Sequence, residues 1–433
     1  MANDISLDTP ISLVASIRNG IDQVNTKTHV LDNGMRVVCY PYPALQTVGL
    51  AVGVRYGSVD ENPMINGSAH FLEHMMFKGT ERRTWRQINE EVKSIGAYQN
   101  AFTSWEMTMY LIQSYKGKFE RAIDITSDMI KGSTIPPKEM ELERGPIINE
   151  NLMSIDNPQN LFQDYMPRAL FKKHPVKMPI GGDNKKTIKK ITRDHLFEIY
   201  EKNYAPENMV VSISGGITEE RALGLAERYF GDFERDYRKK ARSIAREEQK
   251  RTTMKVKKKG IKQARIGVGF KCGEFRPDNI DEYLNMLVVN ELLRYRLYEE
   301  VREKRGLSYD PYCTYNSYQS FGFIAADCGT EPAKVGAAKK VMVGEFKKVQ
   351  DGEISAKEIS NMKEFLRIQY TTRREQTMDY SIAMAMAGLI GGDPTVTERI
   401  PALLDRVSLD SARGYGGKYI DVERAAVVLL EPK

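Results

Sequence analysis

The chain has 433 residues, of which 41% are hydrophobic and 28% are charged, and its formal net charge is +6 at pH 7. This length exceeds what one compact core accommodates and suits two large domains, while the composition is typical of a soluble globular protein. No stretch approaches the apolar length of a membrane span, and the N-terminus lacks the basic and apolar regions of a secretory signal, which argues against a membrane or a secreted protein.

Residues 1–27 are interpreted as an N-terminal extension, and the segments that follow have the patterns of β-strands. The run 29–39 has Asn33-Gly34 near its centre, a dipeptide typical of a tight hairpin turn. At 48–56, apolar residues alternate with small or polar ones, which predicts a strand buried on one face only. These strands begin a first domain that we place at 28–235.

The next segment carries the residues that point to chemistry, the string His70-Phe71-Leu72-Glu73-His74. On a helix, positions i, i+3 and i+4 share one face, so His70, Glu73 and His74 point into one space. Two imidazoles and a carboxylate from elsewhere make a three-ligand zinc site with an open fourth position, where Glu73 can take a proton from a bound water. The chain has only five histidines, and a chance match is expected in roughly one such chain in a few hundred. The alternative is an amphipathic helix whose polar face holds two histidines by chance.

Three further helices are predicted in this half, at 85–95, at 118–130 and from Pro136-Pro137 onward, since proline suits a first helical turn. In the last of these, Glu143 and Glu150 are two helical turns apart and share a face. We expect Glu150 to be the third zinc ligand and Glu143 to hold a histidine as an outer carboxylate. Spacing alone favours a solvated helix face for each glutamate, and the histidine string changes that expectation.

A basic run separates the two halves. From Arg238 to Lys259 the chain has eleven Lys or Arg residues against two acids, and a nucleic-acid-binding patch would have this charge. Only one aromatic residue, Tyr237, accompanies the run, so it offers no stacking surface for bases. We therefore interpret 236–259 as a solvated basic linker and expect no nucleic-acid partner.

The second half, 260–433, repeats the pattern of the first. Apolar residues alternate over 264–270 as they do over 48–56, and a helix is predicted at 281–302 in the place of the histidine-bearing one. No histidine follows His195, so this half can repeat the fold but not the metal site. The predicted fold class is α+β, with two homologous domains, each a mostly antiparallel or mixed sheet covered by helices.

The four cysteines fit no metal-binding spacing and are too sparse for a disulfide framework. Buried reduced thiols are the expected state, since free cysteine is among the most buried residue types. A reducing, cytoplasmic location follows from this interpretation. The residues are Cys39, Cys272, Cys313 and Cys328.

The string at 70–74 is the inverzincin signature, and Gly67–Thr80 around it resembles the zinc helix of the pitrilysin, insulin-degrading enzyme and mitochondrial processing peptidase family almost throughout. The resemblance covers most of the chain and implies a half-length zinc metalloendopeptidase built from two related domains. Within it, Glu150 corresponds to the family's third zinc ligand and Glu143 to its second glutamate.

Pro146 departs from the family pattern, which usually has a helix-compatible residue there. A proline inside a helix removes a hydrogen bond and bends the axis. The bend would fall between Glu143 and Glu150, so the position of Glu143 depends on it.

An edge strand of the family resembles Gly96–Thr103. In the family this strand binds substrate, which implies peptide contacts at Ala97, Asn100 and Ala101. Without the resemblance, Asn100 is equally well a residue at the end of a strand.

A second substrate element of the family resembles Leu297–Tyr309. In that element an arginine and a tyrosine seven residues apart reach the bound peptide, so the resemblance gives this role to Arg302 and Tyr309. Without it, Arg302 would be part of a surface ion pair and Tyr309 a strand aromatic.

The reaction implied is peptide hydrolysis. Zinc held by His70, His74 and Glu150 polarises the scissile carbonyl and activates a water, whose proton Glu73 takes and passes to the leaving amine. Tyr309 can donate a hydrogen bond to the developing oxyanion. The peptide is expected to bind as an added strand at a sheet edge.

The length implies an assembly, because larger single-chain members of the family enclose a chamber with four such domains. Two copies of this chain would rebuild that shell, so we expect a homodimer with Arg302 and Tyr309 acting across the interface. One alternative is a subunit that trims leader sequences together with a separate partner chain. Another is a non-catalytic structural subunit, which the complete set His70, Glu73, His74 and Glu150 disfavours.

Overall fold

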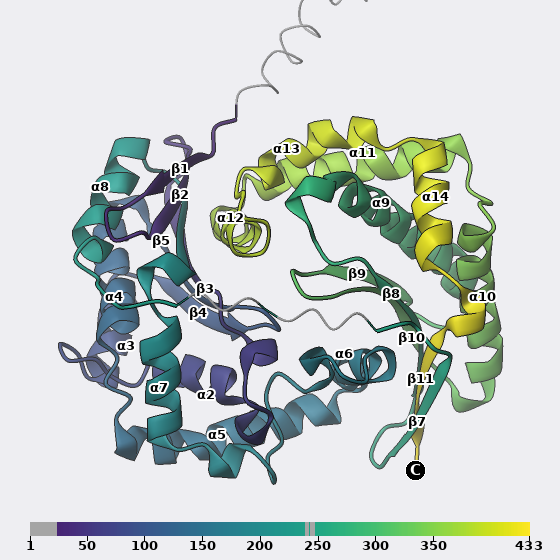
Figure 1. Cartoon of the computed structure of the whole chain (residues 1–433), viewed down its shortest axis with the longest axis horizontal. Helices are drawn as coiled ribbons and strands as arrows, with labels where there is room; N and C mark the ends of the chain where they lie inside the picture. Colours follow the sequence, from purple (N-terminus) through teal and green to yellow (C-terminus); the bar gives the residue numbers. More distant parts are fainter. Residues whose placement is uncertain (1–23, 239–241, 243–246) are drawn as a thin grey trace, which may run out of the picture.

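The computed structural model describes residues 24–238, 242 and 247–433 of the chain. Most of the predicted N-terminal extension, 1–23, and two parts of the predicted linker, 239–241 and 243–246, lie outside the described residues. The described chain forms two halves, each built on one sheet with helices around it (Figure 1).

The first half contains a six-stranded sheet with the strand order β1-β2-β6-β3-β5-β4. β2 and β6 run parallel, and the other neighbours are antiparallel. Its strands are β1 (Lys27–Val30), β2 (Arg36–Pro41), β3 (Thr47–Val54), β4 (Tyr98–Thr103), β5 (Thr108–Tyr115) and β6 (Met209–Gly215). Its helices are α2 (Ser68–Met75), α3 (Trp85–Ser94), α4 (Phe119–Gly132), α5 (Pro137–Asp156), α6 (Pro158–Leu170), α7 (Arg193–Asn203) and α8 (Glu219–Phe230).

The second half contains a five-stranded sheet with the order β7-β11-β8-β10-β9. Its strands are β7 (Thr252–Lys258), β8 (Ala264–Cys272), β9 (Tyr312–Ser317), β10 (Gly322–Thr330) and β11 (Ala426–Pro432). Its helices are α9 (Ile280–Leu297), α10 (Val335–Gln350), α11 (Ala356–Arg373), α12 (Thr377–Gly391), α13 (Val396–Leu403) and α14 (Leu409–Tyr419).

The duplicated α+β fold predicted from the sequence is confirmed. Each sheet has one parallel pair, β2 with β6 and β7 with β11, followed by antiparallel strands that end at an edge strand, β4 or β9. α9, continued by a π-helical turn at Tyr298–Glu303, occupies the position in the second half that α2 has in the first. The predicted hairpin at 29–39 and the helices at 85–95 and 118–130 are present as β1–β2, α3 and α4.

The prediction of a half-buried strand at 48–56 was wrong, because β3 is buried along its whole length after Thr47. One face, which includes Leu50, lies in the core of the first half. The other face carries Gly49 and Gly53, and α12 from the second half packs directly on it. The small residues of this strand therefore make room for a helix and do not face solvent.

In the same way, α6 of the first half packs on the sheet of the second half. Phe162 lies over Gly267 of β8, and Met166 lies over Gly269 two residues along the same strand. Other apolar residues of α6 share a core cluster with β10 and β11. α6 and α12 thus lie between the two sheets, each on the sheet of the opposite half (Figure 1).

The range interpreted as a solvated linker, 236–259, is not a linker throughout. Its last part forms β7, the edge strand paired with β11. Met254 and Val256 are half-buried while Lys255 and Lys257 are exposed. Exposed lysines are common on edge strands because they discourage further strand pairing. Here these lysines led to the prediction of a basic linker where the chain forms a strand.

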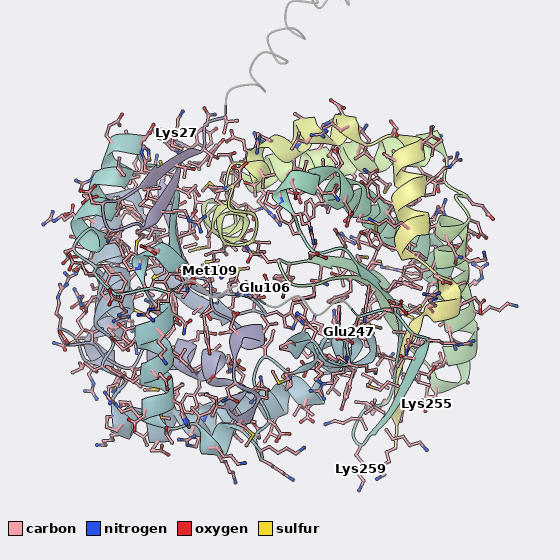
Figure 2. All side chains as sticks on the ribbon, viewed as in Figure 1. Lys27, Glu106, Met109, Glu247, Lys255 and Lys259 are labelled. Carbon is pink, nitrogen blue, oxygen red and sulfur yellow. The ribbon has the colours of Figure 1, made fainter. Side chains whose placement is uncertain are left out.

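Upstream of β7, the connection is held to both halves by buried charges. Arg242 forms ion pairs with Asp60 and Glu106 of the first half. Glu106 is 1% exposed and also accepts hydrogen bonds from the backbone N–H and hydroxyl of Ser320 in the second half. Glu247 accepts three successive backbone N–H groups of the first half. Both glutamates are labelled in the region between the halves in Figure 2.

All four cysteines are free, as expected, and three of them are buried. No helix in the described part of the chain combines the length and apolar character needed to cross a bilayer.

Gly49→Ala tests the packing of α12 on the first sheet. A Cβ at this position would lie 2.7 Å from the backbone carbonyl oxygen of Thr377, which cannot rotate away. We expect the free energy of unfolding to fall by about 1–3 kcal/mol in chemical denaturation. Gly344→Ala on α10 is the control, because its Cβ meets nothing within 4 Å and should stabilise the helix by up to about 1 kcal/mol. Equal stability of Gly49→Ala and the wild type would contradict the described contact.

His174 makes stability depend on pH at the junction of the halves. Its ring packs against Phe171 and Phe321, and its Nδ1 accepts the N–H of Val176. Burial lowers its pKa from 6.5 to about 4, so the unfolded chain binds this proton at higher pH than the folded one. The free energy of unfolding should therefore decrease as pH falls from about 6.5 toward about 4. His174→Asn, which can still accept from Val176, should show a smaller decrease in thermal unfolding; parallel pH profiles would refute this role.

Candidate active site

The helix that carries the histidines, α2, begins at a buried carboxylate. Glu61 accepts hydrogen bonds from the backbone N–H of Gly67 and Ala69 and from the side-chain amide of Asn66, at 2.6 to 2.8 Å. Gly67 has φ +95°, a left-handed conformation that glycine adopts without strain. Carboxyl oxygens at this end accept from N–H groups that have no partner within the helix, so Glu61 fixes where α2 starts. Burial raises the pKa of Glu61 to about 8, against the lowering effect of these hydrogen bonds.

His70, His74 and Glu150 meet at one point. One ligand atom from each lies within 4.8 Å of the other two. The Nε2 of His70 is 3.6 Å from one Glu150 oxygen, and the Nε2 of His74 is 3.2 Å from the other. The opposite face of α2 is buried in the core of the first half, so the histidines are held by a rigid element. Two imidazoles and a carboxylate are a donor set that zinc accepts.

α5 brings both predicted glutamates to this point. The Nδ1 of His74 is 3.0 Å from a carboxylate oxygen of Glu143, which also pairs with Lys78. The helix is continuous through Pro146, and the bend expected there does not separate Glu143 from Glu150. With its Nδ1 bonded to Glu143, His74 leaves Nε2 facing Glu150, as a metal-ligating imidazole requires.

The charges of the cluster are strongly coupled. Burial lowers the pKa of His74, but its hydrogen bonds to Glu143 and Glu150 outweigh burial and raise the pKa to about 9. Hydrogen bonds to His70 and His74 hold the pKa of Glu150 well below its usual range. The carboxylates therefore favour a positive charge at this point, which a divalent cation can supply.

Glu73 lies on the same helix as the two histidines and is buried, at 7% exposure. Burial raises its pKa, opposed by the nearby His70 and by a hydrogen bond from the hydroxyl of Thr103 at 2.5 Å. Thr103 ends β4, so the strand that the sequence assigned to substrate also orients the proposed base. Thr103, Lys78 and Glu61 could not be identified from the sequence, because none of them has a spacing that identifies its partner.

The segment expected to bind peptide is an edge strand, since β4 is the last strand of the first sheet. Ala97 and Ala101 are half-buried against the core. Asn100 is exposed, and its side chain bonds the hydroxyl of Tyr98 and the N–H of Ala101. One side of β4 therefore has no neighbouring strand within the described chain, and the peptide role of these three residues stays a prediction.

Arg302 and Tyr309 lie together in the second half. The guanidinium of Arg302 is 4.2 Å from the centroid of the Tyr309 ring, and Tyr309 is 80% exposed. Among the described residues, no hydrogen bond or ion pair joins either of them to His70, His74 or Glu150. Within the described chain, the two predicted groups therefore contact each other and make no bond to the metal-ligand cluster.

A cavity of about 890 Å³ opens between the halves beside the site. Thr103 and Trp105 of the first half line it, as do Tyr312, Thr314 and Asp327 of the second. Its walls include the two edge strands β4 and β9, so a chain lying in it can meet unpaired strand edges of both sheets.

Comparison with known families identifies each half separately. The model described as Insulinase (Peptidase family M16) matches residues 36–184, and the model described as Peptidase M16 inactive domain matches residues 190–366. The first range contains the histidine string and both glutamates, and the second contains none of them.

Relatives and solved structures agree with this result. An uncharacterized zinc protease of Bacillus subtilis is 29% identical over 94% of this chain and 98% of its own. A probable mitochondrial-processing peptidase subunit beta of Schizosaccharomyces pombe is 34% identical over 48% of this chain and 46% of its own. The structure of a protease from Helicobacter pylori has the same fold, with a TM-score of 0.85 and 20% identity over 94% of this chain and 99% of that one. The periplasmic protease PqqL of Escherichia coli matches with a TM-score of 0.76 and 19% identity, over 94% of this chain but 48% of its own.

Glu143→Gln tests whether the outer carboxylate supports metal binding. Loss of the charge that orients His74 should weaken zinc affinity by about 10- to 100-fold in competition with a chromophoric chelator. Glu141→Gln is the matched control, since Glu141 lies on the same helix but is 66% exposed and, among the described residues, pairs with Arg144 on the helix surface. Equal zinc affinity in the two variants would remove Glu143 from the site.

Proposed function

We propose that this chain, which belongs to peptidase family M16 as a half-length member, is a zinc-dependent endopeptidase acting on peptides or unfolded segments. The observation that carries the proposal is the convergence of His70, His74 and Glu150, with Glu73 beside them. Zinc, when bound there, would polarise the scissile carbonyl and lower the pKa of a water.

The protein's own groups perform the proton transfers in this proposal. Glu73 accepts the proton of the attacking water and returns it to the leaving amine. Thr103 holds its carboxylate in place through the hydroxyl hydrogen bond, and burial keeps the proton affinity of Glu73 higher than that of an exposed glutamate. Glu143 positions His74.

The substrate in this proposal binds along β4 as an additional strand. Backbone hydrogen bonds along this edge, which includes Ala101, would hold any extended sequence with weak side-chain preference, next to Ala97 and the side chain of Asn100. The exposed side chain of Asn100 and the open edge of β4 support this mode of binding.

We further propose a homodimer in which Arg302 and Tyr309 of one copy complete the site of the other. The support is that these residues are exposed and do not contact the histidines of their own chain, although the family resemblance gives them contacts to substrate. The match to about half of a larger solved protease supports an assembly of two copies. The four free cysteines support a reducing compartment such as the cytoplasm.

A second candidate function is a leader-processing subunit that works with a separate partner chain. The 34% identity to the probable processing peptidase subunit over 209 residues favours it. A non-catalytic subunit is the third possibility, and the presence of all four residues of the site opposes it.

The first test is mass spectrometry of an unstructured peptide pool incubated with the zinc-loaded protein. Glu73→Gln should reduce cleavage by about 10²- to 10⁴-fold, because the proton acceptor is lost while the metal ligands stay. Glu90→Gln on the exposed side of α3 should leave cleavage unchanged. Equal cleavage by Glu73→Gln and the wild type would sink the mechanism, and cleavage only after a partner is added would favour the processing subunit.

A mixing experiment tests whether Tyr309 acts across a dimer. Glu73→Gln and Tyr309→Phe, each with low activity alone, should form hybrid dimers in which one of the two sites has both intact groups. An equimolar mixture should then recover about a quarter of wild-type activity, since half of the dimers are hybrids. No recovery after subunit exchange, with exchange shown by mass, would mean that Tyr309 acts within its own chain or not at all.

A further inference from the structure

The second half has its own cavity where the first half has the histidine cluster. α9 packs against β9 and α11 as α2 packs against β4 and α5. Between these elements lies a cavity of about 490 Å³, lined by residues that include Asn290, Glu291, Arg294, Tyr312 and Arg373. At the position where the first half has its metal-ligand cluster, the second half therefore has a pocket with different side chains.

Two polar groups of this cavity make no hydrogen bond or ion pair with the described residues. Asn290 is 6% exposed, and its side-chain oxygen accepts no hydrogen bond. Arg373 forms no ion pair with the described residues; its guanidinium lies 5.8 Å from the centroid of the Tyr370 ring. A buried amide without a partner costs free energy, which a ligand with polar groups can recover.

The cavity has three other charged residues. Glu291 pairs with Arg294 at 2.7 Å, and Arg294 also lies over the ring of Tyr312. Asp379 lines the same cavity and is exposed at the start of α12. The cavity as a whole is close to neutral, so its charges match a ligand that carries both an acidic group and hydrogen-bond donors.

A smaller apolar pocket of about 220 Å³ adjoins this cavity. Tyr315, Tyr370 and Arg373 line both spaces. Asp379 lines only the larger one, so the charged group at the junction of the two is Arg373. The remaining walls of the small pocket are mainly apolar or aromatic and include Phe275, Tyr283, Ala383, Met386 and Ile390.

β9 separates these spaces from the cavity beside the histidine site. Tyr312 and Thr314 line both the 490 Å³ cavity and the 890 Å³ cavity, and Asn316 lines the 890 Å³ cavity and the apolar pocket. Thr103, which bonds Glu73, lines the 890 Å³ cavity. An extended chain can therefore run from Glu73 across the edge strand β9 to Arg373.

We propose that the space at Arg373 binds the free C-terminal carboxylate of a peptide substrate whose last residue is apolar. The carboxylate and the side chain of a terminal residue leave the same Cα, which fits a guanidinium at the mouth of an apolar pocket. Arg373 donates charge-assisted hydrogen bonds to the carboxylate. This inference rests on the proposed peptidase function and names the end by which its substrate is held.

Binding to the full-length Glu73→Gln protein, loaded with zinc, tests the anchor without cleavage. The probes are two fluorescent unstructured peptides that end in phenylalanine, one with a free carboxylate and one amidated. We expect the free form to bind about tenfold more tightly in fluorescence anisotropy, since one charge-assisted pair is lost on amidation. Equal affinity of the two peptides, or binding of neither, would overturn the proposal.

Adding Arg373→Gln should remove the tenfold preference for the free carboxylate. Lys357→Gln is the matched control, because this substitution also removes one positive charge from α11. Lys357 is exposed and does not line the cavity. Ala387→Phe should fill the apolar pocket and weaken binding of the phenylalanine peptide relative to one ending in glycine. A preference that survives Arg373→Gln, or that is lost equally in Lys357→Gln, would refute the assignment.

Cleavage of the same peptides by the protein with Glu73 intact separates this proposal from the peptidase function. Cleavage of both peptides with equal kcat/KM would leave the peptidase standing and refute the anchor. A tenfold preference in binding without cleavage of either peptide would support the anchor and refute the peptidase.

Discussion

Each sheet of this protein is completed by a helix from the opposite half, and the position of every other feature depends on this exchange. α12 covers one face of the first sheet, and α6 covers one face of the second. The contacts are close because Gly49 and Gly267 have no side chains to hold the helices away. Neither half can bury both faces of its sheet alone, so the hydrophobic driving force favours the two halves folding against each other.

The histidine site is connected to this exchange through α5. α5 and α6 are separated by one residue, Asn157, whose side chain accepts the N–H of Gln159 and so fixes the start of α6. α6 is held on the second sheet, while α5 is held in the first half by Met140 and Ile147, which are buried in the same core as α2. The first half therefore positions all three metal ligands, and the helix that carries the third ligand continues, after one residue, into the helix that covers the second sheet.

The sequence predicted what depends on local spacing. The string at 70–74 and the two-turn separation of Glu143 and Glu150 fixed which side chains share a helix face, and helical geometry does the rest. It failed where a distant element decides the environment. The small residues of β3 led to the prediction of a solvent-facing side, because no residue near β3 in the sequence indicates that α12 covers it. Likewise β7 read as linker, since the lysines that protect an edge strand outweigh its half-buried Met254 and Val256 in any count of charge.

The two halves show how one scaffold can hold two kinds of chemistry. In each, a helix that follows the central strands faces an edge strand and a long helix. The junction in the first half holds His70 and His74 against Glu150, whose charges attract a cation, and the junction in the second half is a pocket. In the second half Glu291 is neutralised by Arg294, which leaves Arg373 as the unpaired charge at the mouth of the apolar pocket. Because β9 is a wall common to the second pocket and the cavity beside the histidines, the two sites can act on one extended chain. Their difference in charge is what would give that chain a direction.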